Sequence, residues 1–257
     1  MNASPSHYGD FMSRLKKTAA LYLAITLAVS ALFAPGCKKS SNPAAATVVP
    51  ITVDIFPLTV GHSISYTGYL RAVGTDSNVT STLYSSSWTV VSNSAATPLG
   101  GTSNLIIESI TAPTASTESL YVLRVPPTGD ANFSFIQKVS YMGADTLAWV
   151  LAGDSQDGVG AYWHAFVDSS RSGDSTFGLW IVGHFADEES LSVGGQAFDT
   201  YRLAITSNNL IDSLVTGQPD IPMATYWFSP GIGPVKIIVN ATEQKSGYEW
   251  DYKSRNF

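Results

Sequence analysis

Short apolar runs separated by turn residues recur along the chain from about Val48 onward. No long window repeats its apolar residues with the 3.6-residue period of a helix. Strands at this spacing predict an all-β domain, built as a sandwich or as a curved antiparallel sheet that forms an incomplete barrel. The candidate strands are 48–56, 63–73, 87–91, 105–111, 120–125, 133–142, 146–152, 161–167, 176–185, 197–206, 210–215, 224–228 and 235–241.

Alternation along two of these strands predicts how they are buried. Both faces of 176–185 are apolar, with Trp180 on one of them, so we expect a central strand that is covered on both faces. One face of 161–167 is wholly apolar, whereas the other carries Tyr162 and His164. The second face is expected to border a cavity or solvent.

A hairpin is predicted near the end of the sequence, where strand 224–228 runs into Ser-Pro-Gly-Ile-Gly-Pro and strand 235–241 follows. Upstream, the Gly-Gly pair at 194–195 opens another strand, with Phe198 three residues after Gly195. This Gly-x-x-Phe strand, followed by Phe-Ser-Pro-Gly-x-Gly-x-Val-Lys at 228–236, resembles uncharacterised secreted bacterial lipoproteins of the TapB-like kind, over roughly 191–239. The resemblance implies an all-β periplasmic or surface domain akin to the curved sheets of outer-membrane lipoprotein carriers, and it implies no reaction.

The first 36 residues have the layout of an export signal. Three basic residues between positions 14 and 17 precede an uncharged apolar run at 18–34. We expect 1–36 to be a signal peptide with little or no helix elsewhere in the chain, and Met12 is an alternative start.

The single cysteine indicates the kind of signal. Phe33-Ala34-Pro35-Gly36-Cys37 resembles a bacterial lipobox, which implies cleavage after Gly36 and acylation of Cys37. The alternative is a free cysteine near an ordinary cleavage site. Acyl chains would hold the protein on a membrane, with 37–47 as a flexible tether. Lys38 rather than Asp after the cysteine favours the outer membrane, on its periplasmic face or at the cell surface.

Composition limits the function of the remaining 48–257, which we expect to form one domain. The 257-residue chain is 44% hydrophobic and 13% charged, which is enough apolar material for a sizeable core and excludes disorder over most of its length. Twenty acidic residues against 14 basic ones give a net charge of -6, which argues against a nucleic acid partner.

One motif suggests catalysis. Gly153-Asp154-Ser155 and the following Asp-Gly look like the nucleophile block of GDSL esterases, with Ser155 as the nucleophile. That family supplies its base through Asp-x-x-His, which this sequence lacks, and Gly-Asp-Ser recurs at 173–175. A turn is the simpler interpretation, so we expect a binding protein rather than an enzyme.

Metal binding has weak candidates in Asp154 and Asp157. They lack the alternating ligands and the closing Glu of a calcium loop. Solvated turns explain them better, and no cofactor is expected.

The tryptophans suggest binding. Trp163, Trp180 and Trp227 are candidates to line a site for an acyl chain or to stack on sugars or peptides, although core packing explains tryptophans in strands as well. The leading hypothesis is an envelope lipoprotein whose β domain binds a lipid or other apolar ligand. The alternative is a structural or protein- or glycan-interaction module, with no protein partner identified.

Overall fold

The computed structural model describes residues 50–257 except 112–114, 125–131, 142–143, 155–157, 173–174, 212–213, 216–220 and 243–244. The chain divides into two units, Met1–Ala46 and Thr47–Phe257, and the fold concerns the second. Its strands are β1 (Ser63–Arg71), β2 (Tyr84–Ala96), β3 (Thr102–Ile110), β4 (Ser116–Arg124), β5 (Phe133–Tyr141), β6 (Ala144–Gly153), β7 (Tyr162–Ser172), β8 (Ser175–Val193), β9 (Gln196–Ile211), β10 (Leu214–Val215), β11 (Ile221–Ser229), β12 (Gly233–Val239) and β13 (Gly247–Arg255). The described residues contain no helix, so the all-β prediction is confirmed.

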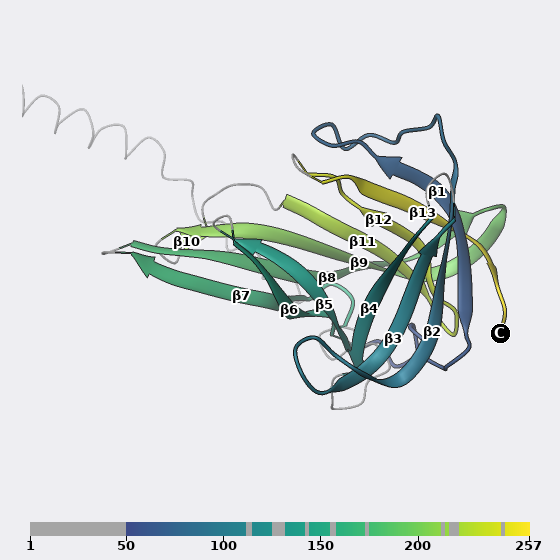
Figure 1. Cartoon of the computed structure of the whole chain (residues 1–257), viewed down its shortest axis with the longest axis horizontal. Helices are drawn as coiled ribbons and strands as arrows, with labels where there is room; N and C mark the ends of the chain where they lie inside the picture. Colours follow the sequence, from purple (N-terminus) through teal and green to yellow (C-terminus); the bar gives the residue numbers. More distant parts are fainter. Residues whose placement is uncertain are drawn as a thin grey trace, which may run out of the picture. The chain divides into compact units, whose positions relative to one another are not determined.

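The strands form one antiparallel, barrel-shaped sheet (Figure 1). Its order is β6-β5-β4-β3-β2-β1-β13-β12-β11-β9-β8-β7, and β10 pairs with β9. No ladder joins β6 to β7 in the described part of the chain. Instead, the indole Nε1 of Trp163 on β7 donates a hydrogen bond to the carbonyl of Leu151 on β6 at 2.8 Å. The sheet is therefore a nearly closed barrel with a seam, as the curved-sheet prediction anticipated.

Aromatic rings fill the barrel interior near one end. Phe56 packs edge-on or tilted against Phe133, Phe135 and Phe228, with ring centroids 5.3, 6.0 and 5.5 Å apart. All four rings are at most 3% exposed. Phe133, Phe135 and Phe228 come from β5 and β11, so alternation along the strands turns them inward. Edge-to-face packing of this kind favours a tightly filled core.

The predicted strand at 48–56 is wrong over its described residues, because positions 50–56 are not in a ladder. This segment instead closes one end of the barrel, with Ile51 and Ile55 buried. The Phe56 amide donates to Asp54 Oδ1 at 2.9 Å, and Arg124 Nη2 contacts both Asp54 Oδ1 and the Phe56 carbonyl. Side chains thus supply the backbone partners that a ladder would otherwise provide.

The remaining local predictions can be compared directly with the strands. β8 is paired on both sides, and β7 turns Tyr162 and His164 to solvent. The two hairpins lie where their turn residues predict them, between β8 and β9 and between β11 and β12. Strand β13 is absent from the predicted set.

Candidate functional site

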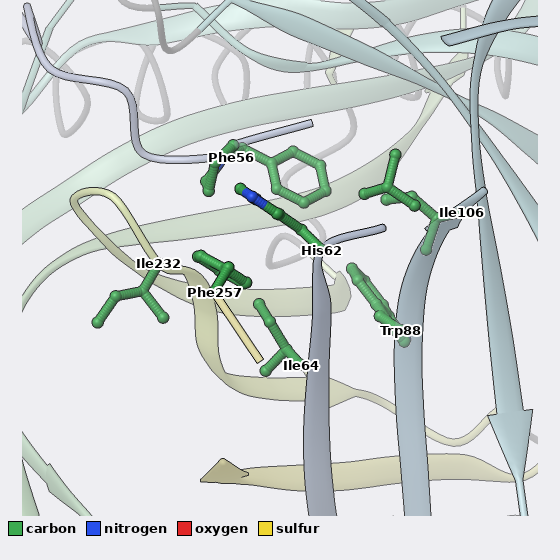
Figure 2. A pocket seen from close by; sticks show the side chains of 9 residues that line it. Phe56, His62, Ile64, Trp88, Ile106, Ile232 and Phe257 are labelled. Atoms are coloured by element: carbon green, nitrogen blue, oxygen red, sulfur yellow. The ribbon is translucent and has the colours of Figure 1, made fainter. Parts of the chain in front are cut away.

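The described residues form a small pocket at the end of the barrel beside the 50–57 segment (Figure 2). Its cavity volume is about 20 Å³, room for about one water molecule and far below the range of about 300–1,000 Å³ typical of drug-sized ligands. Eight of the nine lining residues are apolar. The lining is Phe56, Pro57, His62, Ile64, Trp88, Val90, Ile106, Ile232 and Phe257. As it stands, the pocket has room for a group of about the size of a methyl group.

His62 is the polar member of this lining. Its ring stacks on Phe257 with centroids 4.0 Å apart and planes within 5°. Its Nδ1 is shielded from solvent and makes no hydrogen bond among the described residues. A shielded ring nitrogen without a partner is costly unless a ligand or water supplies one. The pocket therefore combines an apolar wall with one free hydrogen-bonding atom.

The backbone around His62, just before β1, is held by β2 on one side and by the residue that follows β13 on the other. The Val90 amide donates to the His62 carbonyl at 2.9 Å, and the Gly61 amide donates to the Val90 carbonyl at 2.8 Å. Asn256 adds two side-chain bonds: its Oδ1 accepts from the Ser63 amide at 2.7 Å, and its Nδ2 donates to the Gly61 carbonyl at 3.2 Å. The backbone at residues 61–63 is thus held from both sides, and the stacking on Phe257 positions the imidazole.

The buried carboxylate of Glu108 lies in the barrel beside Trp88, one of the pocket residues. Glu108 Oε1 accepts hydrogen bonds from Trp250 Nε1 at 3.0 Å and Ser86 Oγ at 3.1 Å. Burial raises the pKa of Glu108, and the nearby hydrogen-bond donors reduce this effect. The indole N–H of Trp88 also faces this carboxylate and lowers its pKa, although it makes no hydrogen bond of strict geometry.

The three tryptophans chosen from the sequence do not form one site. Trp163 is 5% exposed and bridges the seam from inside the barrel. Trp180 and Trp227 are half-buried on the opposite face of their strands. Sequence reasoning did not select the pocket residues Trp88 and His62, because they are placed together only by the pairing of β1 with β2.

Several predicted site residues lie outside the described part of the chain. These are Gly36, Cys37, Ser155 and Asp157. Asp154 is described and has an interaction partner. Within the described ranges, no three His, Cys, Asp or Glu side chains form a group able to hold a metal ion. No helix among the described residues is long and apolar enough to span a membrane.

Comparisons with known proteins give likenesses of fold only. No protein-family model and no curated protein matches the chain. A structure from Parabacteroides distasonis, described as a candidate lipoprotein, is 14% identical with a TM-score of 0.44, covering 79% of this chain and 99% of its own. A candidate exported protein with a YmcC-like fold from Bacteroides fragilis is 14% identical with a TM-score of 0.38, covering 79% of this chain and all of its own. These likenesses support no assignment of function.

Proposed function

We propose that the protein is an envelope lipoprotein, anchored through acylated Cys37, whose β domain binds an apolar group in the pocket at the end of the barrel. The observation that carries the binding proposal is the pocket itself. Its wall is apolar except for His62, whose Nδ1 has no partner among the described residues. A ligand with an apolar body and one hydrogen-bonding group would satisfy both features.

The size of the pocket limits the ligand. The rings of Phe56, Phe133 and Phe228 occupy the barrel interior beside it, so a whole acyl chain does not fit within the space as it stands. With a cavity volume of about 20 Å³, the pocket holds only the terminal methyl of such a chain, and a larger part of the ligand enters where the lining side chains move aside. This is narrower than the lipid cavity that the sequence suggests.

The test is native mass spectrometry with solvent extraction on the mature chain purified from a bacterial envelope. A stoichiometric apolar molecule that leaves on extraction supports the proposal. Binding is then measured by quenching of tryptophan fluorescence with that molecule, or with short-chain fatty acids and indole when none is carried. A chain that carries nothing and binds none of these probes overturns it.

A pair of variants localises the binding. Ile232 lies half-buried in the turn before β12, so Ile232→Trp should obstruct the pocket without entering the core. Leu99→Trp is the matched control, because Leu99 is 42% exposed in another turn and is not part of the lining. Loss of binding in the first variant alone supports this pocket, whereas equal binding in both would place the ligand elsewhere.

The anchor has a separate test. Cys37→Ser should abolish incorporation of labelled fatty acid into the protein, because the sulfur is the acceptor. Subsequent membrane fractionation of the unaltered chain tests the proposed outer-membrane location. Labelling that persists in the variant contradicts the anchor and leaves the pocket proposal unaffected.

A further inference from the structure

Stacked rings gather on the outer face of β7 and β8, away from the pocket. Tyr162 and His184 lie directly opposite each other in the ladder, with ring centroids 3.8 Å apart and planes within 10°. Tyr162 is 64% exposed. On the same face, the exposed His164 meets the half-buried Trp180 edge-on at 4.6 Å. These four side chains are referred to as the ring cluster.

Outside the ring cluster, the same outer face carries another aromatic side chain, Trp227 on β11. Trp227 is opposite Arg202 of β9, and Arg202 is opposite Asp187 of β8. A bulge at Ala186 places Asp187 rather than its neighbour in this row. Trp227 Nε1 donates to Glu189 Oε1 at 2.7 Å, which fixes the indole against the sheet.

Small side chains separate the ring cluster from Trp227. The row that begins with Tyr162 and His184 continues through Ala204 on β9 to Thr225 on β11. Figure 1 shows β7, β8, β9 and β11 side by side. Tyr162 and Trp227 are three strand spacings apart across the sheet, roughly 14 Å, and about 7 Å apart along the strands, because Trp227 lies two residues beyond Thr225. The face therefore has an aromatic side chain at each end, and the side chains between the two ends are small.

The charges of this face are balanced internally. Arg202 hydrogen-bonds Asp187, and its Nε lies 3.6 Å from Glu189 Oε1. The next cation along the row, Lys236, is bound to two acidic residues of β13. A polyanion or an anionic lipid surface would find no free cation here among the described residues, whereas hydroxyl groups can share both the donors and the acceptors.

The apolar surface of the face is aromatic rather than aliphatic. Among the described residues, Tyr162 is its one large hydrophobic side chain exposed beyond a third. Burial lowers the pKa of His184. The charge of Asp187 opposes this effect, and the charge of Arg202 adds a smaller contribution to it. The stacked imidazole is therefore neutral at pH 7. Flat neutral rings with nearby paired polar groups suit the apolar faces and hydroxyls of sugar rings.

We propose that the outer face of β7, β8, β9 and β11 binds a neutral oligosaccharide, with sugar rings stacked on Tyr162 and Trp227. Hydroxyl groups between them contact Arg202, Asp187 and Thr225. The distance between the two aromatic side chains selects a chain of several sugars over a monosaccharide. This site is independent of the pocket and of its ligand.

The test uses the full mature chain in detergent on an array of neutral and acidic glycans, followed by calorimetry with the tightest neutral oligosaccharide. Tyr162→Ala and Trp227→Ala should each weaken binding about tenfold, because each removes one stacking surface. Tyr162→Phe should retain most of the affinity. Tyr69→Ala on β1 is the matched control, since Tyr69 is a half-buried tyrosine on another part of the wall, and it should bind normally.

Binding by no neutral glycan, or a preference for acidic ones, overturns the proposal. Unchanged affinity in both alanine variants does so as well. Circular dichroism establishes that each variant is folded, and Tyr162→Ala decides alone if the Trp227 variant is not, because Tyr162 is largely exposed. Ile232→Trp should leave glycan binding unchanged, which separates this site from the pocket.

Discussion

Phe56 is the aromatic side chain that the 50–57 segment buries at the end of the barrel, so Phe56→Ala tests how that end is held. Phe56 is 3% exposed and its ring has four aromatic neighbours. Transfer of such a side chain from water contributes about 1.5–3 kcal/mol, and the cavity left behind adds to the loss. We expect the variant to lose about 3–5 kcal/mol of unfolding free energy, in the upper half of that range because the neighbouring rings are rigid.

The assay is equilibrium unfolding in guanidinium chloride, followed by tryptophan fluorescence, on the soluble chain from Ser40 onward. Val53→Ala is the matched control, because Val53 belongs to the same segment and is 40% exposed. It should change stability by no more than about 0.5 kcal/mol. A loss below about 1 kcal/mol in the Phe56 variant would refute the claim that this ring completes the core. The vacated space adjoins the pocket, so the variant should also bind larger apolar probes.

Three further predictions concern other parts of the barrel. Burial raises the pKa of Glu108, so its favourable contribution is present below its unfolded pKa and is lost as pH rises through the folded pKa. Glu108→Gln should flatten that decline in unfolding free energy measured from about pH 4 upward. Hydrogen bonds and charges, including those of Lys236, outweigh burial and lower the pKa of Glu249. The contribution of Glu249 to the unfolding free energy is therefore lost as pH falls. Lys236→Gln should destabilise the protein at neutral pH but little in acid. A Cβ on Gly183 would lie 2.3 Å from the ring of Trp163, so Gly183→Ala should displace the indole that bridges the seam. We expect a loss of about 1–3 kcal/mol in the unfolding free energy measured with a chemical denaturant. Unchanged stability would contradict this packing.

The sequence predicts turns and strand faces well where local chemistry determines them. The turn at 194–195 needs left-handed backbone, and both glycines adopt positive φ, 59° and 82°. In the hairpin between β11 and β12, Pro234 is the second residue of β12, and its carbonyl accepts a hydrogen bond from the Tyr66 hydroxyl at 2.9 Å. Tyr162 and His164 are exposed as alternation requires. Each of these features depends on residues close together in the chain.

Local sequence does not predict the structure where distant segments determine it. Residues 50–56 have the composition of a strand, but bonds from Arg124 and the rings of β5 and β11 hold them as a closing segment. Strand β13 alternates clearly, but its charged residues hide the apolar positions in the sequence. Tyr248, Trp250 and Tyr252 face inward. Glu249, Asp251 and Lys253 face outward. The charges could be recognised as an outer face only once Lys236 on β12 was known to pair with them.

The placement of the tryptophans explains why counting them could not locate a site. Trp88, Trp163 and Trp250 point into the barrel and are at most 5% exposed, so their surfaces contribute to packing. Trp180 and Trp227 lie on the outer wall, where a ligand can reach the exposed part of a ring. Bulges in β7 and β8 shift the alternation within single strands, so a period-two count across them assigns the wrong face. Tryptophans on the inner face of the sheet thus contribute to core packing, whereas those on the outer face are available to contact a ligand.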